Sequence, residues 1–277
     1  MSKKRKHNAK SEVPSPDTDN IVHMDEELHI PHAYVATPAY DGKVDTDYSQ
    51  ALASACWHAA ALGVQVTASV MGNGAFIELA RNIFCKFFLE HEELKDCTHL
   101  FFIDSDLKFG ANAFHGLITS DKPICAGIYP RRQSPPDYPC TWWPLPDQDE
   151  DNRLWIDDDG WLKAKRVPTG FLCIRRDIIE EMAAGVEWLD IHGQEGGVPW
   201  LFETRITEDK KFMGEDFVFC DKYVEKYDKP IDVWMDFDFV HGGYEGNYLK
   251  YLNEQTELYK QHQEDNKKPR GFKRKRA

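Results

Sequence analysis

The sequence predicts one α/β domain with a mostly parallel central sheet flanked by helices and an elaborated C-terminal half. Apolar runs of strand length alternate with helical patterns through the first half of the chain, which is the arrangement that produces parallel strands. One run, Leu100 to Ile103, is entirely apolar and suits a central strand covered on both faces. The chain has 277 residues, of which 42% are hydrophobic, so a sizeable core is feasible.

The first half of the chain has the clearest pattern of elements. A short β run at 33–37 is followed by Pro38, which we expect to stop the strand. A helical pattern over 51–62 ends at Gly63, as helices often do. The other elements expected here are strands over 64–70, 100–103 and 124–129, and helices over 76–89 and 111–118. This alternation favours a doubly wound, Rossmann-like sheet.

The second half of the chain is less regular. Residues 130–153 are rich in Pro, Asp and Trp and are expected to form a long loop, and a hairpin is expected to turn at Asp159-Gly160. The further elements expected are a strand ending at Arg175, helices over 177–184, 216–226 and 246–263, and a strand over 231–234. We therefore divide the chain into a flexible arm (1–31), one domain (32–248), and a C-terminal helix with a basic tail (249–277).

The charge of the chain is unevenly distributed. The formal net charge is -13, yet the first ten residues carry five Lys or Arg and the last eleven carry seven, with no acid in either stretch. Residues 11–266 therefore carry -25. Two interpretations stay open: the tails solubilise the ends of the chain, or they act as arms that bind a polyanion such as DNA. The acidic body alone would repel such a partner.

The composition predicts a soluble, cytoplasmic protein without a membrane partner. No apolar run approaches the roughly 20 residues that span a bilayer. The basic N-terminus has no apolar stretch behind it, so a secretory signal is not expected. The seven cysteines are odd in number and form no CxxC pair, which favours reduced thiols over disulfides or a zinc site.

The clearest chemical motif is Asp104-Ser105-Asp106, directly after the apolar run. Ligands of open α/β sheets bind beyond the carboxyl ends of the strands, where this motif is expected to lie. Two neighbouring ionised carboxylates repel each other unless a cation lies between them. Because Mg²⁺ and Mn²⁺ take oxygen ligands and bridge carboxylates to a diphosphate, the motif predicts a site for one of these ions. The alternative is a solvated Asp-x-Asp turn.

Further motifs follow in an order that resembles the GT-A-fold glycosyltransferases, whose Asp-x-Asp motif the segment above is similar to. The resemblance covers about residues 33–248. It consists of Thr37-Pro38-Ala39-Tyr40, Ala80-Arg81-Asn82, Asp104-Ser105-Asp106, Thr169-Gly170-Phe171-Leu172, Gly214-Glu215-Asp216-Phe217 and Val240-His241-Gly242-Gly243. Each segment is short, but six in order are specific for the fold, although not for a sugar.

The resemblance implies roles for several of the matching residues. It assigns nucleotide contacts to Thr37, Pro38, Tyr40, Arg81, Asp104 and Ser105, metal coordination to Asp104, Asp106 and His241, and the catalytic base of an inverting reaction to Asp216, with Glu215 in reserve. Simpler interpretations stay open. Arg81 is also the kind of residue found on helix surfaces, Glu215 and Asp216 are favourable anions at a helix N-terminus, and a lone histidine is often structural.

These observations predict a metal-dependent glycosyltransferase that uses a nucleotide-diphosphate sugar, such as a UDP-sugar. The resemblance is closest to compact members encoded by phages and large viruses, some of which glycosylate hydroxymethylated pyrimidines in their own DNA. Together with the basic tails, it favours modified DNA as the acceptor, with a glycan or a protein as alternatives. Arg131 and Arg132 are candidates for a phosphate path, and Asp236-Phe237-Asp238 is interpreted as a surface feature.

Two other classes of protein stay in consideration. Nucleotidyltransferases share the α/β architecture and the metal-binding aspartates, but their first loop is usually rich in glycine, unlike Pro38 to Lys43 here. A non-catalytic nucleic-acid-binding module would use only the basic tails. The intact Asp104 and Asp106 pair argues against that class. Fold does not determine function, so the prediction of a transferase rests partly on the resemblance.

Overall fold

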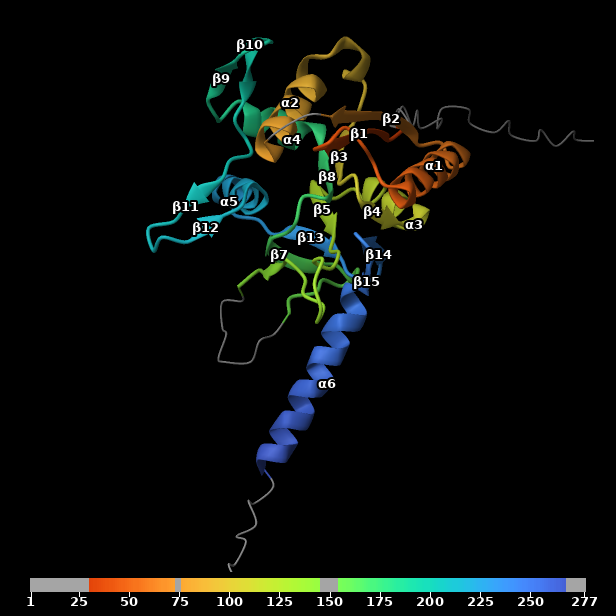
Figure 1. Cartoon of the computed structure of the whole chain (residues 1–277), viewed down its shortest axis with the longest axis vertical. Helices are drawn as coiled ribbons and strands as arrows, with labels where there is room; N and C mark the ends of the chain where they lie inside the picture. The colour runs from red at the N-terminus through yellow and green to blue at the C-terminus, as the bar shows by residue number, and fades with distance from the viewer. Residues whose placement is uncertain (1–29, 73–75, 145–153, 268–277) are drawn as a thin grey trace, which may run out of the picture.

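The computed structural model describes residues 30–72, 76–144 and 154–267. An eight-stranded sheet with the order β2-β1-β3-β8-β5-β13-β7-β6 forms its centre (Figure 1). Its strands are β1 (His32–Ala39), β2 (Gln65–Gly72), β3 (His99–Ile103), β5 (Ile124–Gly127), β6 (Thr141–Trp142), β7 (Leu162–Arg166), β8 (Phe171–Arg175) and β13 (Ile231–Trp234). The sheet is mixed, with most of its central strands running in one direction.

Strand pairing gives the direction of each strand. β1 is parallel to β2 and β3, and β13 is parallel to β5. β8 lies between β3 and β5 and is antiparallel to both, so β3 and β5 themselves point the same way. β7 is antiparallel to β13. The predicted Rossmann-like α/β fold is confirmed, with β8 inserted in the opposite direction among the parallel central strands.

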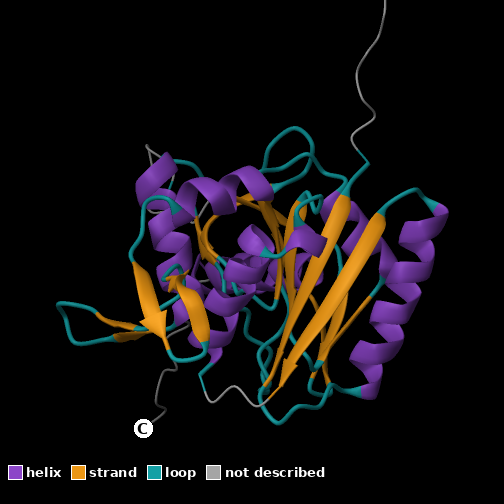
Figure 2. Ribbon diagram, turned by 90° about the horizontal axis from the view of Figure 1, so that it is seen from above, coloured by secondary structure: helices purple, strands orange, loops and turns teal. Residues whose placement is uncertain are grey.

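Helices cover both faces of this sheet (Figure 2). They are α1 (Thr46–Ala61), α2 (Ile77–Glu90), α3 (Ala111–Ile118), α4 (Arg176–Ala183), α5 (Glu215–Tyr227) and α6 (Tyr248–Lys267), with a short 3-10 helix at Glu92–Leu94. Alternate residues of the buried strands face two separate cores: Phe102 packs with residues of α2, α4 and α5, and Phe101 packs with residues of α1 and α3. This two-sided burial explains why the strand at Leu100 to Ile103 is apolar without interruption.

Three small sheets complete the described fold. β4 (Leu107–Phe109), β14 (Asp238–His241) and β15 (Tyr244–Asn247) form one of them in the order β15-β14-β4. β9 (Trp188–Ile191) pairs with β10 (Gln194–Pro199), and β11 (Arg205–Ile206) pairs with β12 (Phe212–Met213). These short strands were not predicted, because they are brief, partly polar and stabilised by neighbours distant in sequence.

The structure corrects the expected end of the first strand. Pro38 was expected to stop it, but β1 continues to Ala39 and pairs with β2 along its whole length. β3 pairs only with Ala33–Ala36, so Pro38 has a neighbouring strand on one side alone. Its missing N–H therefore costs no ladder bond toward β3. The strand expected over 124–129 is shorter and ends at Gly127.

The C-terminal part of the described chain is the long helix α6, which projects away from the sheet (Figure 1). The acidic body thus continues into a helix that leads toward the basic C-terminal tail, which lies outside the described residues, as does most of the N-terminal arm. No helix in the described part of the chain combines the length and apolar composition of a membrane span. All seven cysteines are free thiols.

Candidate functional site

Chemically active side chains gather at the carboxyl edge of the parallel strands. Asp104 directly follows β3, and Tyr129 comes two residues after β5. β8 runs in the opposite direction, so Gly170, just before it, lies at the same edge and accepts the backbone N–H of Asp104 at 3.0 Å. α5 begins here with Glu215 and Asp216 in its first turn. The topology therefore brings together segments that are far apart in the sequence.

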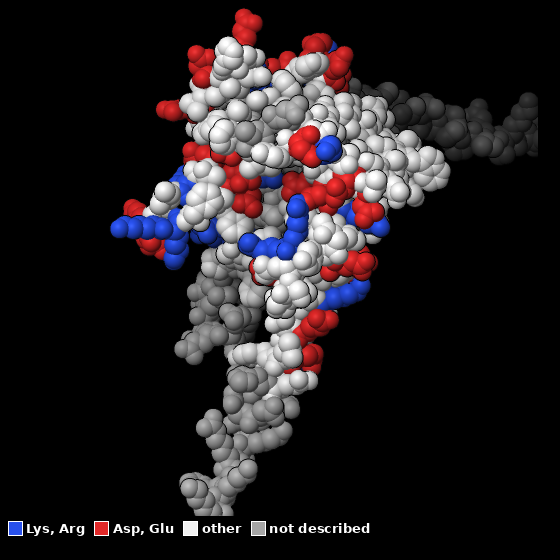
Figure 3. Space-filling model, viewed as in Figure 1, with Lys and Arg blue, Asp and Glu red and all other residues white. Residues whose placement is uncertain are grey.

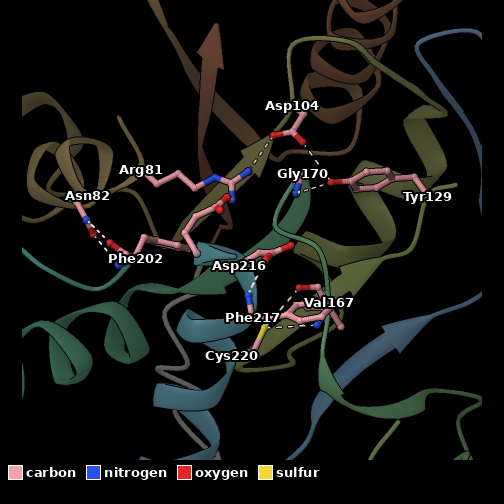
Figure 4. Close-up of polar contacts among 11 residues, drawn as sticks. Arg81, Asn82, Asp104, Tyr129, Val167, Gly170, Phe202, Asp216, Phe217 and Cys220 are labelled. Atoms are coloured by element: carbon pink, nitrogen blue, oxygen red, sulfur yellow. Dashed lines mark hydrogen bonds and ion pairs between the residues drawn. The ribbon is translucent and has the colours of Figure 1, made fainter. Parts of the chain in front are cut away.

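Arg81 is a buried cation that joins two of these segments. Its side chain, on α2, is 4% exposed. Nη1 donates to Glu215 Oε1 at 2.6 Å and Nη2 donates to Asp104 Oδ1 at 3.2 Å (Figure 4). Burial alone would lower the pKa of Arg81, but the charges of Asp104 and Glu215 outweigh it and the pKa is raised. Arg81 therefore remains charged and holds both carboxylates in place.

Tyr129 holds the other oxygen of the Asp104 carboxylate. Its hydroxyl donates to Asp104 Oδ2 at 3.2 Å and accepts the N–H of Gly170 at 3.0 Å (Figure 4). Burial, and then the charge of Asp104, raise the pKa of Tyr129 well above its ordinary value, so the phenol stays protonated and remains a donor. A Cβ at Gly170 would lie 2.2 Å from both Asp104 Oδ2 and the Tyr129 hydroxyl. Glycine is thus required for this close approach.

Asp106 faces a different set of groups from Asp104. His241 Nε2 lies 3.6 Å from Asp106 Oδ1, and the Arg132 guanidinium makes an ion pair with Asp106 Oδ2. Arg132 Nε also donates to His241 Nε2 at 3.2 Å. The pairing of β14 with β4 places His241 opposite Leu107, next to Asp106 in sequence. The two aspartates of one short motif therefore serve two adjoining clusters.

The hydrogen bonds of His241 define its tautomer. Nδ1 lies 2.8 Å from the carbonyl oxygen of Pro130, which can only accept, so Nδ1 carries the proton. Nε2 is therefore unprotonated, and its lone pair accepts from Arg132 Nε, with Asp106 Oδ1 3.6 Å away. Burial lowers the pKa of His241, which favours the neutral ring. A neutral histidine held by a carbonyl at one nitrogen is the form that binds metal ions at the other.

Asp216 is the least neutralised carboxylate near Arg81. Its Oδ1 accepts the N–H of Phe217 at 2.7 Å, whereas Glu215 beside it pairs with Arg81 (Figure 4). Burial, and then the charge of Glu215, raise the pKa of Asp216 above its ordinary value. A carboxylate with a raised pKa in a partly buried position is suited to accept a proton.

Two buried polar atoms at this site have no hydrogen-bond partner. Among the residues that the structure describes, Arg81 Nε and Thr169 Oγ1 are the side-chain atoms with this property. Leaving such a group unpaired costs about 1–3 kcal/mol. Thr169 precedes Gly170 in the chain, and Arg81 lies beside Asp104. Their unmet bonding capacity is typical of a site that is completed by a ligand.

The predicted metal ligands are only partly brought together. Asp106 and His241 face each other with suitable donor atoms, whereas Asp104 is directed to Arg81 and Tyr129. In the described part of the chain, no three His, Cys, Asp or Glu side chains form a group that could hold a metal by themselves. The donor chemistry of Asp106 and His241 fits Mn²⁺ or Mg²⁺ when substrate oxygens supply further ligands, as these ions commonly require.

The residues predicted to contact a nucleotide lie in two environments. Thr37 and Pro38 are buried, and the Thr37 hydroxyl lies 2.5 Å from the hydroxyl of Tyr48. Tyr40, at the end of β1, is 78% exposed and Ser105 is half-buried. Tyr40 is therefore available for stacking on a base, whereas the side chains of Thr37 and Pro38 are buried within β1.

The charge around the site is predominantly negative. Figure 3 shows acidic side chains on both sides of a hollow in the middle of this face, with basic side chains below it. The carboxylates of the two clusters are Asp104, Asp106, Glu215 and Asp216, and their cations are Arg81 and Arg132. Carboxylates outnumber guanidinium groups, which favours the binding of an additional cation.

The motifs did not reveal every residue of the site. Tyr129 was assigned no role from the sequence, and Thr169 was considered only as part of the segment Thr169-Gly170-Phe171-Leu172, which resembles the strand lining the acceptor side. Tyr129 follows a buried strand just as Asp104 does, so its position after β5 was a usable signal. The unpartnered hydroxyl of Thr169 was not predictable, because it depends on how surrounding elements pack.

A cavity of about 850 Å³ lies at the opposite edge of the sheet. It is lined by the beginnings of β1, β2 and β3 and by the end of β8. The charged groups there include Arg175, which is paired with Asp177, and Arg176, which donates to backbone carbonyls. We place the site at the carboxyl edge, because the raised pKa of Asp216 and the unpartnered polar atoms occur there.

The site thus belongs to an α/β protein of Rossmann-like fold with an acidic cluster at the carboxyl edge of its sheet. No family model matches the chain, and a search of curated proteins gives no match. Among solved structures, the chain is similar to A197 from STIV, with a TM-score of 0.44 and 12% identity over 76% of this chain and 85% of that one. It is also similar to the inositol-1-phosphate CTP transferase from T. maritima, with a TM-score of 0.35 and 11% identity over 74% and 85% of the two chains. Similarities this low carry no argument about a ligand or a reaction.

Proposed function

We propose that this protein is a metal-dependent glycosyltransferase that moves a sugar from a nucleotide-diphosphate sugar, such as a UDP-sugar, to an acceptor hydroxyl. The observation that carries the proposal is the pair formed by Asp106 and His241. Their Oδ1 and Nε2 atoms lie 3.6 Å apart at the ligand-binding edge of the sheet. A half-buried carboxylate with a raised pKa, Asp216, lies in the first turn of the neighbouring helix α5.

Asp106 and His241 would hold Mn²⁺ or Mg²⁺, with Asp104 as an additional ligand on rearrangement of its contacts. When bound, the ion would neutralise negative charge that develops on the departing diphosphate. Arg81 and Tyr129 each bind one oxygen of the Asp104 carboxylate, so the orientation of this carboxylate is fixed. Rigid support of this kind lowers the cost of reorganisation during the reaction.

Asp216 is the proposed base, which would accept the proton of the acceptor hydroxyl in an inverting reaction. Glu215 is less suitable, because its carboxylate is engaged by Arg81 at 2.6 Å. Burial and the charge of Glu215 raise the pKa of Asp216, and the nearby charge of Arg81, which lowers it, does not outweigh them. A base must also lie within hydrogen-bond reach of the hydroxyl, so the acceptor is expected to bind between Asp216 and the metal.

The nucleotide is expected to bind along the end of β1. Tyr40 is exposed there and offers an aromatic face for a base. The loop from Pro38 to Lys43 contains one glycine and does not resemble a phosphate-binding loop, which favours a nucleotide sugar over a nucleoside triphosphate as the donor.

For the acceptor we propose a hydroxymethylated pyrimidine in DNA, with a glycan or a protein hydroxyl as the alternatives. The support is the charge pattern: twelve basic residues at the two ends flank a body that carries -25. Basic arms of this kind bind phosphate backbones, whereas the acidic body has no attraction for DNA.

The first experiment is thermal melting with a panel of nucleotide sugars, with and without Mn²⁺. A donor at a hundredfold its Kd adds about 2.7 kcal/mol of stability, which raises the Tm by roughly 5–10 °C for a protein of this size. We expect one donor to give this shift only with Mn²⁺, and Asp106→Ala to lose both the shift and the release of nucleoside diphosphate.

Asp238→Ala is the matched control. Asp238 belongs to the second Asp-x-Asp segment, is 80% exposed and pairs with Lys250 at 3.0 Å. Its removal should leave the donor response intact. Wild-type turnover in Asp106→Ala would refute the proposed site. A lack of response to every donor would favour a nucleotidyltransferase or a nucleic-acid-binding protein, which melting with nucleoside triphosphates and with DNA would distinguish.

A further inference from the structure

We propose that Arg132 is a diphosphate-binding residue that occupies the cation position between Asp106 and His241 until a divalent metal displaces it. This inference rests on the proposed function and concerns the order in which metal and donor bind. It assigns one guanidinium group two successive partners: the metal ligands first, and the diphosphate of the donor afterwards.

Arg132 uses the same two residues that a metal ion would need. Its guanidinium makes an ion pair with Asp106 Oδ2, and its Nε donates to His241 Nε2 at 3.2 Å. The lone pair of His241 Nε2 accepts from Arg132 and cannot coordinate a metal at the same time. Arginine remains charged and cannot act as a metal ligand. Binding of the ion therefore requires Arg132 to leave.

The backbone next to His241 provides a place for the Arg132 side chain. Gly242 has φ +55°, and a Cβ there would lie 2.9 Å from Arg132 Cδ and 3.0 Å from Nε. The aliphatic part of Arg132 therefore packs directly against Gly242. The N–H of Gly242 donates to the carbonyl oxygen of Asp106 at 3.3 Å, which ties this turn to the metal-binding residues.

Arg132 is free to move in a way that Arg81 is not. The Arg132 side chain is 56% exposed, whereas the Arg81 side chain is 4% exposed and fixed between two carboxylates. A displaced Arg132 would remain at the rim of the site, beside the bound ion. Guanidinium groups bind phosphate oxygens bidentately, so the diphosphate of the donor is the partner expected there.

Adjacent Arg131 provides a contrast within the same segment. Arg131 Nε pairs with Asp137 Oδ2 at 3.0 Å, and its backbone N–H donates to the carbonyl oxygen of the same residue. None of its described contacts reaches Asp106 or His241. Removing Arg131 therefore changes the charge of the loop by the same amount as removing Arg132 but leaves the two metal-binding residues as they are.

The experiment measures Mn²⁺ affinity by titration calorimetry for the wild type, Arg132→Ala and Arg131→Ala, without and with saturating UDP. Without UDP, we expect Arg132→Ala to bind Mn²⁺ on the order of tenfold more tightly than the wild type, because no guanidinium has to be displaced. With UDP, the wild type should gain more affinity for Mn²⁺ than Arg132→Ala does, because only the wild type gains the new contact. Arg131→Ala should match the wild type in both conditions.

The outcomes separate the two proposals. Equal or weaker Mn²⁺ binding by Arg132→Ala without UDP, in a wild type that binds Mn²⁺, would overturn the role of Arg132 and leave the proposed function standing. An absence of Mn²⁺ binding in the wild type and in both variants, with UDP present, would overturn both. If Arg131→Ala and Arg132→Ala both bound Mn²⁺ more tightly than the wild type without UDP, the inference would also be overturned. Such a result would reflect the charge of the loop alone.

Discussion

Two opposing effects act on the ionised form of Asp216. It lies in the first turn of α5, where a negative charge is favoured by the helix dipole. Burial and the adjacent charge of Glu215 nevertheless raise its pKa, so the ionised form is disfavoured relative to a solvated aspartate. Natural sequences keep such residues where function requires them, at a cost in stability.

The sign of this effect leads to a prediction for Asp216→Asn. Because the pKa of Asp216 is higher in the folded than in the unfolded protein, its contribution to stability is fully present below the unfolded value and is lost as pH rises through the folded value. At pH 7 the ionised group therefore destabilises the fold. We expect Asp216→Asn to raise the Tm by a few degrees at pH 7, to lose this advantage near pH 3, and to abolish transfer.

Asp221→Asn, on the same helix, is the control with the opposite expectation. Asp221 forms a bidentate ion pair with Arg166, at 2.7 and 2.8 Å, so its neutralisation should lower the Tm at pH 7. Melting curves from pH 3 to 8 would compare the two variants. A decrease in Tm for Asp216→Asn at pH 7 would contradict the assigned sign.

At the scale of elements, α2 connects the site to the rest of the fold through two consecutive residues. Arg81 reaches Asp104 and Glu215, and Asn82 binds the loop between β10 and β11. The side-chain amide of Asn82 donates to the carbonyl oxygen of Phe202 at 2.7 Å and accepts from the N–H groups of Leu201 and Phe202. The helix therefore positions the buried cation while a buried amide fixes the loop beside it.

Removal of the Asn82 side-chain amide should lower the free energy of unfolding. Asn82 is fully buried, and Asn82→Ala would remove the hydrogen bonds of Asn82 with the N–H and carbonyl groups of Phe202, whereas the N–H of Leu201 would keep its bond to the carbonyl oxygen of Pro199. We expect a loss of roughly 3–5 kcal/mol in the free energy of unfolding, measured by urea denaturation. Asn112→Ala, at an exposed position near the start of α3, should change this free energy by less than about 0.5 kcal/mol. A near-neutral Asn82→Ala would show that the loop is held by other contacts.

At the scale of the whole molecule, the distribution of charge is the dominant feature. The body of the chain is strongly acidic, and Figure 3 shows acidic side chains on both sides of a hollow on one face. Of the 34 Lys and Arg residues, twelve lie in the two basic tails, and of these twelve only Lys267 lies within the described residues. The proposed binding of DNA therefore depends on the ends of the chain, because residues 11–266 carry -25.

Deletion of residues 1–10 and 267–277 tests this dependence. The tails hold twelve basic residues, and the logarithm of DNA affinity falls with the logarithm of salt concentration by about 0.9 for each phosphate neutralised. We expect the full chain to show a steep slope in fluorescence anisotropy and the doubly truncated chain to bind weakly with little salt dependence. Unchanged affinity and slope after truncation would refute the role of the tails. Melting of the truncated chain with the donor serves as the control for an intact site.

Much of the fold was readable from local patterns. Leu100 to Ile103 could be assigned to a buried central strand, because its apolar run has strand length and is followed by two aspartates. The helix over 111–118 and the strand over 231–234 have the predicted bounds, since each has a regular pattern with clear ends. The β14 and β15 strands were missed, because short polar strands are determined by pairing rather than by periodicity.

The sequence by itself determined the α/β class, the position of the acidic motif after a buried strand, and the separation of basic ends from an acidic body. Only the tertiary structure decided which groups meet. Asp104 faces Arg81 and Tyr129 while Asp106 faces His241 and Arg132, although the two aspartates are separated by one residue. The physical reason is that these partners come from α2, from the segment after β5 and from β14. Their convergence depends on the order and direction of strands, which no local pattern encodes.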